Sequence, residues 1–113
     1  VAASSSRRAA GAAAGPPPPP PAAARALVHH AALLIDNDQP ANAACSMAKL
    51  FAGDMVVAQT SNAVQIFGGS GFIRGFEVER LYRDAKICQI YEGTQQIQRT
   101  VIARELIKNG SRL

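Results

Sequence analysis

The chain has 113 residues, of which 48% are hydrophobic and 18% charged, and its formal net charge is +4. This length gives room for one ordinary domain, and the apolar share is too high for a chain disordered throughout. A large multidomain enzyme and a fully disordered protein are therefore excluded for a chain of this length.

The start of the chain differs in composition from the rest. Residues 1–24 hold ten Ala and six Pro and no acidic side chain, so little there can pack into a core. The run 16–21 predicts a stiff polyproline II rod, because each proline fixes φ and lacks an N–H donor. We interpret 1–23 as a disordered Ala/Pro-rich tail and 24–113 as the folded domain. A spacer is favoured over a ligand for a proline-recognising module.

Charge, aromatic content and cysteine spacing bear on the partners. Residues 25–113 carry ten basic and eight acidic side chains with the two signs interleaved, and aromatic residues make up only 5% of the chain. We therefore expect no nucleic-acid binding. No apolar run reaches the roughly 18 residues of a bilayer span, so we expect no membrane anchoring. Cys45 and Cys88 lack metal-ligand spacing, and the adjacent His29 and His30 cannot share one metal from one helix face, so we expect no metal.

Helical periodicity and the spacing of breakers predict four helices, over 24–35, 41–67, 78–90 and 94–108. The second helix has one apolar side that includes Met47 and Phe51 as core residues. It ends at a glycine-rich turn, 68–71. Thr94 is the expected N-cap of the last helix, and Asn109 with Gly110 forms its stop signal.

The last helix carries apolar residues on more than one side. At 100° per residue, Ile97 and Val101 lie on one side and Ile102 and Leu106 on the other. A helix that is apolar on several sides is normally buried on several sides. The sequence therefore predicts partners beyond these short helices, either other helices of a longer chain or another subunit.

Two segments are candidates for chemistry. Residues 65–72 (QIFGGSGF) place glycines after a helix, whereas dinucleotide and P-loop motifs follow a strand. An ordinary helix-ending turn is favoured there over a pyrophosphate site. Glu92 stands before Gly93 and the last helix, where a carboxylate is a candidate general base. By spacing alone, a favourable interaction with the helix N-terminus is preferred over catalysis as its explanation.

Five segments, in this order, resemble the C-terminal domain of acyl-CoA dehydrogenases. They are 44–52 (ACSMAKLFA), 65–72 (QIFGGSGF), 78–87 (VERLYRDAKI), 89–94 (QIYEGT) and 96–99 (QIQR). The resemblance extends over roughly 24–110. It implies an all-α fold, a four-helix bundle of the acyl-CoA dehydrogenase C-terminal type whose first helix is only partly represented.

The resemblance also implies an activity and its site. It implies an FAD-dependent flavoprotein oxidoreductase that oxidises the Cα–Cβ bond of an acyl-CoA thioester, as in fatty acid β-oxidation. Glu92 takes the position of the base that removes the α-proton while hydride passes to FAD, and Gly93 leaves space for the thioester. The residues implied to contact the cofactor are Gln65, Ile66, Phe67, Gly68 and Gly69, toward the FAD of a neighbouring subunit, with Thr94 and Gln96 also nearby.

Partners and context follow from the same resemblance. It implies a homo-oligomer, a dimer or tetramer with FAD shared between subunits, and an electron-transfer flavoprotein as redox partner. Arg83 and Asp84 are expected to form a structural pair beneath the loop. Because members of the family are several times longer, we expect a C-terminal fragment from a truncated or fragmentary gene.

Several alternatives stay open. The alternative function is a non-catalytic helical oligomerisation module derived from the family. Glu92 in the loop favours the short-chain and straight-chain types. The expected compartment is the bacterial cytoplasm, with the mitochondrial matrix as the alternative, because both are reducing and suit unpaired cysteines.

Overall fold

The computed structural model describes residues 21–110, and all regular secondary structure in this part of the chain is helical. Its elements are α2 (Pro21–Asp36), α3 (Asn42–Phe67), α4 (Gly69–Phe72), α5 (Glu77–Lys86), the 3₁₀ helix η1 (Ile87–Gln89) and α6 (Gln95–Lys108). The prediction of an all-α fold is confirmed. The polyproline run lies outside the described residues except for Pro21, which is the first residue of α2, a position that proline tolerates.

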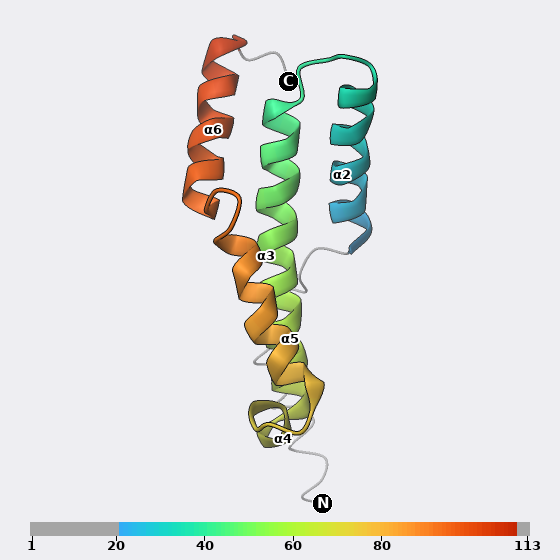
Figure 1. The fold of residues 1–113 in the computed structure, drawn as a ribbon, viewed down its shortest axis with the longest axis vertical. Helices are drawn as coiled ribbons and strands as arrows, with labels where there is room; N and C mark the ends of the chain where they lie inside the picture. Colours follow the sequence, from blue (N-terminus) through green and yellow to red (C-terminus); the bar gives the residue numbers. More distant parts are fainter. Residues whose placement is uncertain (1–20, 111–113) are drawn as a thin grey trace, which may run out of the picture.

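The long helix α3 is the centre of the fold. Figure 1 shows α2 and α6 on opposite sides of its N-terminal half, while α5 packs along its C-terminal half. The molecule is elongated, with extents of 60 × 27 × 24 Å and a radius of gyration of 18.1 Å. A compact domain of 100 residues would have a radius of gyration of roughly 13 Å. Every other helix therefore depends on α3 for most of its packing.

Two segments differ from the sequence prediction. The glycine-rich turn contains the short helix α4, because Gly68 ends α3 with φ 60° and the chain coils again from Gly69. The helix predicted over 78–90 is divided into α5 and η1. The Ile87 carbonyl accepts hydrogen bonds from the N–H groups of Ile90 and Tyr91, which tightens the chain and ends the helix.

The core consists mainly of small side chains. Its buried hydrophobic members are Ala24, Ala31, Ala48, Val78 and Ala85, and no side chain of residues 21–110 is less than 2% exposed. The prediction that Met47 and Phe51 are core residues is wrong, because both are only half-buried. The helices of this chain meet through alanines and leave the larger apolar side chains at the edges of the contacts.

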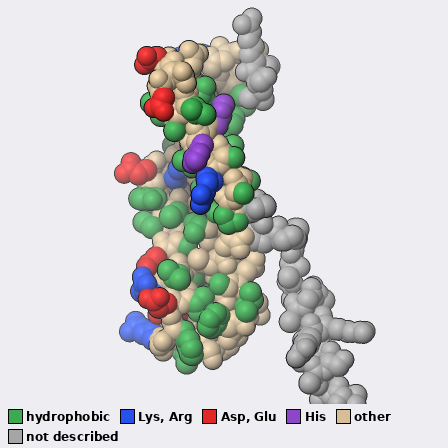
Figure 2. Space-filling view, turned by 90° about the vertical axis from the view of Figure 1, so that its right-hand side faces the viewer, with side chains coloured by type: hydrophobic (Ala, Val, Ile, Leu, Met, Phe, Trp, Pro, Cys, Tyr) green, Lys and Arg blue, Asp and Glu red, His purple; other side chains and the backbone are tan. Residues whose placement is uncertain are grey.

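Many large apolar side chains are exposed to solvent. The most exposed are Ile66 at 84%, Phe72 at 83% and Ile107 at 82%. Figure 2 shows hydrophobic side chains spread along the whole length of one face. On α6, Ile97 and Ile107 are 54% and 82% exposed whereas Val101 and Ile102 are half-buried, so the described chain covers the apolar surface of this helix only in part. Partners for this apolar surface beyond the present chain stay a prediction.

The charged residues of α5 pair along their own helix. Arg80 contacts Glu77 at 3.1 Å and Asp84 at 2.9 Å, and Arg83 contacts Glu79 at 3.3 Å. The predicted pair of Arg83 with Asp84 is therefore wrong. Adjacent residues on a helix point about 100° apart, whereas residues three or four apart are neighbours. These exposed pairs contribute little to stability.

Candidate functional site

The loop between η1 and α6 has an unusual backbone. Glu92 has φ 52° and Gly93 has φ 90°, so two successive residues lie in or near the left-handed region. Glutamate seldom adopts this conformation, and such residues persist only where their surroundings hold them. A Cβ atom at Gly93 would also come 2.7 Å from Gln98 Nε2. Glycine is therefore favoured at position 93 by its φ, whereas a Cβ atom there would displace only the end of the Gln98 side chain.

Side chains from α3 and α6 hold the carbonyl groups of this loop. Lys49 Nζ donates to the Gly93 oxygen at 2.6 Å. Gln98 Nε2 donates to the oxygens of Glu92 and Gly93 at 3.1 and 3.3 Å. Thr94 Oγ1 accepts a hydrogen bond from Ile97 N–H at 3.4 Å, which confirms the predicted N-cap. The loop is thereby fixed by donors from α3 and from α6.

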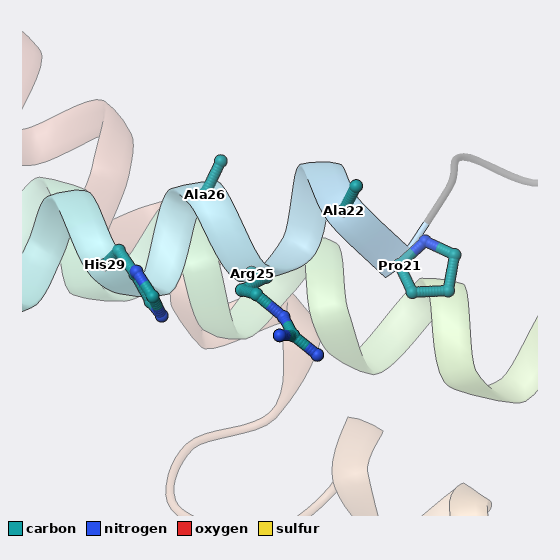
Figure 3. Close-up of a pocket in the computed structure, with 5 residues that line it drawn as sticks. All are labelled: Pro21, Ala22, Arg25, Ala26 and His29. Atoms are coloured by element: carbon teal, nitrogen blue, oxygen red, sulfur yellow. The ribbon is translucent and has the colours of Figure 1, made fainter.

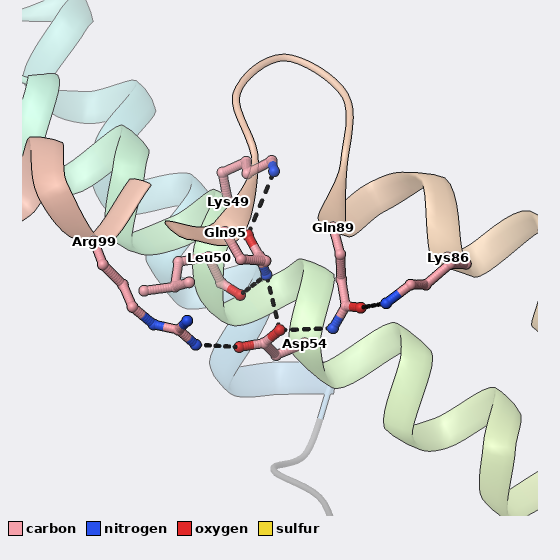
Figure 4. A network of polar contacts seen from close by, with 7 residues as sticks. All are labelled: Lys49, Leu50, Asp54, Lys86, Gln89, Gln95 and Arg99. Carbon is pink, nitrogen blue, oxygen red and sulfur yellow. Dashed lines mark hydrogen bonds and ion pairs between the residues drawn. The ribbon is translucent and has the colours of Figure 1, made fainter. Parts of the chain in front are cut away.

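A polar network anchors the two ends of the loop to α3 (Figure 4). Asp54 Oδ1 accepts hydrogen bonds from Gln89 Nε2 at 2.7 Å and from Gln95 Nε2 at 3.0 Å. Gln95 Nε2 also donates to the Leu50 carbonyl at 2.7 Å, and Asp54 Oδ2 lies 3.5 Å from Arg99. Gln95 is only 4% exposed. One carboxylate of α3 thus joins η1, where the loop begins, to α6, where it ends.

The sequence analysis did not identify Lys49, Asp54, Gln95 or Gln98 as site residues. A signal for two of them was present, because Lys49 and Asp54 are the two charged residues of the 26-residue helix α3. A charge on an otherwise uncharged helix that packs on several neighbours needs a polar partner. No comparable signal marks the two glutamines, which look like ordinary surface residues in the sequence.

The Glu92 side chain is exposed, and within residues 21–110 its carboxylate has neither a hydrogen bond nor an ion pair. The pKa of the neighbouring Tyr91 is raised by Cys88, a residue of η1. The negative charge of the Cys88 thiolate, and secondly its hydrogen bond with the phenol, raise the pKa of Tyr91 above its usual value of 10.0. The loop therefore combines a fixed backbone with a carboxylate that is free to meet another molecule.

The other predicted cofactor residues lie far from this loop. Gln65, Ile66, Phe67, Gly68 and Gly69 form the end of α3 and the turn after it, and all are exposed. Asp54 is eleven residues before Gln65, which corresponds to about 16 Å along the helix. Thr94 and Gln96 instead belong to the start of α6. The structure therefore separates the seven predicted residues into two clusters at different levels of α3.

A hollow of about 550 Å³ lies beside the first cluster, between α3, α4 and α5. Phe72 and Tyr82 give it aromatic surfaces. Because Arg83 is paired with Glu79, another lining residue, the net positive charge comes from Lys86. Gly69 has an ordinary φ, and a Cβ atom there would meet nothing within 4 Å. Because nothing in the described chain requires glycine at position 69, its backbone is open to approach by another molecule. Aromatic and cationic groups suit a flat, anionic ligand.

The remaining features offer less chemistry. A hollow along α2 is lined by Pro21, Ala22, Arg25, Ala26 and His29 (Figure 3). Its described lining consists of aliphatic side chains with the basic Arg25 and His29, all from one helix, and includes no acidic residue. No group of three or more potential metal ligands occurs in residues 21–110. In the same range, no helix is both long and apolar enough to cross a bilayer.

Comparison with known proteins identifies relatives of this arrangement. The family profile "Acyl-CoA dehydrogenase, C-terminal domain" matches residues 21–107. A cyclohexane-1-carbonyl-CoA dehydrogenase of Geobacter metallireducens is 48% identical over 78 residues, which are 69% of this chain and 20% of the relative. The short-chain specific acyl-CoA dehydrogenase of Bos taurus mitochondria is 47% identical over 77 residues, which are 68% of this chain and 19% of the relative.

A solved structure shares the fold. Butyryl-CoA dehydrogenase of Megasphaera elsdenii superposes with a TM-score of 0.72 and 44% identity, over 75% of this chain and 22% of that chain. The present chain therefore spans about a fifth of the length of the proteins that it matches.

Proposed function

The chain belongs to the acyl-CoA dehydrogenase family, as its C-terminal domain, and on this premise we propose that it forms part of an FAD-dependent acyl-CoA dehydrogenase. The proposed reaction is α,β-dehydrogenation of an acyl-CoA thioester. Glu92 is the proposed base, and Gly93 leaves room for the thioester beside it. A short, straight acyl chain is proposed from the position of Glu92 in the loop, since relatives of similar identity are named for short-chain and for cyclohexane-1-carbonyl thioesters alike.

The conformation of Glu92 is the observation that carries this proposal. A glutamate at φ 52° is held in a costly conformation, and the carbonyls on both sides of the Glu92–Gly93 peptide bond accept hydrogen bonds. A base must be placed within hydrogen-bond reach of the proton that it removes, and a fixed loop meets that demand. An exposed carboxylate without a partner in residues 21–110 is free to accept that proton.

In the proposed step, the Glu92 carboxylate takes the α-proton of the thioester and becomes a carboxylic acid. A bound acyl chain would exclude water from the loop, and desolvation makes a carboxylate a stronger base. FAD, when bound, would supply the acceptor for the β-hydrogen as hydride. Thr94 and Gln96, at the start of α6, are the residues proposed to lie near the cofactor on this side of the domain.

The second cluster suits a contact with a cofactor held by another subunit. Gln65 through Gly69 are exposed about 16 Å along α3 from the anchoring network. Beside them lies the hollow with aromatic and cationic walls, and the open backbone at Gly69 allows close approach. We therefore propose a homo-oligomer, a dimer or tetramer, in which FAD is shared between subunits, with an electron-transfer flavoprotein as redox partner. The two free cysteines suit a reducing compartment, the bacterial cytoplasm or the mitochondrial matrix.

A chimera tests the assignment of the base. Residues 21–107 would replace the matching segment of the Megasphaera elsdenii butyryl-CoA dehydrogenase, and Glu92→Gln would be compared with Asp38→Asn. Asp38 is an exposed acidic residue with the same φ of 52°, but it lies in the turn before α3. We expect Glu92→Gln to lower kcat roughly 10²- to 10⁴-fold with unchanged flavin content, and Asp38→Asn to leave kcat unchanged. A Glu92→Gln chimera with full activity contradicts the assignment.

The exposed apolar surface favours a second candidate, a non-catalytic module that assembles through its helices. Large apolar side chains at 82–84% exposure occur on α3, α4 and α6. Size-exclusion chromatography of the chain with and without added FAD, read at a flavin wavelength, separates the two functions. An oligomer that carries flavin supports the enzyme, whereas a flavin-free oligomer supports the module.

A further inference from the structure

Lys49 is the cation closest to the Glu92 loop among the contacts of the described residues. Its Nζ lies 2.6 Å from the Gly93 oxygen and 3.4 Å from Gln95 Oε1. The side chain extends from a half-buried position on α3, and within residues 21–110 it has no carboxylate partner. The half-buried Lys49 ammonium therefore has only neutral oxygens as acceptors in the described chain, one in the loop and one on Gln95. Burying part of a charge without a charged partner costs stability, so we expect it to have a use in the loop that it contacts.

The position of Lys49 is set independently of the loop. It lies one turn of α3 before Gly53, and Asp54 anchors both ends of the loop to the next turn. A Cβ atom at Gly53 would come 2.9 Å from the Cys88 carbonyl, so α3 and η1 are already in close contact there. The lysine therefore extends from a rigid platform toward a loop whose two ends are fixed.

We infer that Lys49 is a positioning residue for Glu92: by donating to the Gly93 carbonyl, it holds the left-handed backbone that presents the Glu92 carboxylate. Gln98 donates to the same Gly93 carbonyl and also to the Glu92 carbonyl, so the Gly93 carbonyl is held by one donor from α3 and one from α6. This inference rests on the proposed role of Glu92 as base. Lys49 itself acts only through the backbone.

Hydrogen–deuterium exchange of the whole chain, read by mass spectrometry, tests the inference without requiring turnover. The informative amides are those of Ile97 and Gln98, which bond to Thr94 in the first turn after the loop. Loss of a hydrogen bond from a charged donor should open this turn, so Lys49→Met should speed exchange of the peptide over 90–98 roughly 10- to 100-fold.

Controls separate positioning from general stability. Lys108→Met removes an exposed lysine at the far end of α6, and its exchange over 90–98 should match the unmodified chain. Lys49→Arg keeps a charged donor and should restore most of the protection. A purely structural role would speed exchange in α2 as much as in the loop. Equal effects of Lys49→Met on both regions, or equal effects of the two Met variants, would overturn the inference.

Two further measurements test the role of Lys49. If Lys49→Met does not fold, Lys49→Gln retains an N–H donor without the charge, and its smaller increase must be confined to the peptide over 90–98. In the chimera, Lys49→Met should lower kcat more than it changes KM. Full activity of Glu92→Gln in that chimera would refute the base, and faster loop exchange in Lys49→Met would then show that Lys49 positions a loop without that catalytic role.

Discussion

Gly53 of α3 lies against the Cys88 carbonyl of η1, close enough that a Cβ atom at Gly53 would come 2.9 Å from the carbonyl oxygen. The same Cβ atom would lie 2.9 Å from Gln95 Nε2. A glycine in the middle of a helix normally costs stability. Here it permits the contact between α3 and η1 on which the Asp54 network and the loop depend.

We predict that Gly53→Ala destabilises the fold although alanine is the better helix former. The gain of about 1 kcal/mol in helix propensity is outweighed by overpacking against a backbone oxygen, which costs about 1–3 kcal/mol. The free energy of unfolding, measured by urea denaturation, should fall by up to about 2 kcal/mol. Gly69→Ala is the control, because a Cβ atom there meets nothing within 4 Å. Equal stability of the two variants would show that α3 and η1 are not in close contact.

A second prediction concerns the conformation of Glu92. Glycine relieves the strain of φ 52°, so Glu92→Gly should leave the free energy of unfolding unchanged or raise it by up to about 1 kcal/mol. Glu105→Gly, within α6, should lower it by about 1 kcal/mol. Thermal unfolding of both variants checks the opposite signs. If both variants lose stability alike, the backbone of Glu92 is not strained.

The helices were predictable because their signals are local. The predicted helix over 41–67 is α3 to within one residue, and Thr94 was identified as N-cap from its own position before the last helix. The turn at 68–71 was expected from its glycines, but the extra coil of α4 depends on packing. A Cβ atom at Gly71 would come 2.7 Å from the Val64 carbonyl, a contact that no local pattern indicates.

The support of the site was not predictable in the same way. Lys49 and Gly93 are 44 residues apart, and Asp54 and Gln95 are 41 apart, so their contacts depend on how α6 docks on α3. The prediction that Met47 is buried was wrong for a different reason. Met47 has the spacing of a core residue, yet it stays half-buried because it lines an open hollow between α2, α3 and α6. Periodicity shows which face of a helix is apolar but not what covers it.

A third prediction follows from the raised pKa of Tyr91. Tyr82→Phe would leave Tyr91 as the only tyrosine, and its phenolate absorbance should then titrate above pH 10. The folded chain keeps this proton to a higher pH than the unfolded chain does. The contribution to stability is therefore complete below about pH 10 and is lost as the pH rises through the folded pKa. Adding Cys88→Ser should return the titration toward pH 10, and an unchanged titration would rule out Cys88 as the cause.

The final prediction is that the exposed apolar side of α6 drives self-association. Ile97 and Ile107 are 54% and 82% exposed, and burial of such side chains in a second copy contributes about 1.5–3 kcal/mol each. The double variant Ile97→Gln with Ile107→Gln should therefore weaken assembly at least tenfold in sedimentation velocity. Stability of the monomer should hardly change, because neither side chain is buried in it. Lys108→Gln, at an exposed polar neighbour, should assemble normally. An unmodified chain that sediments as a monomer would mean that α6 requires a cover other than a second copy.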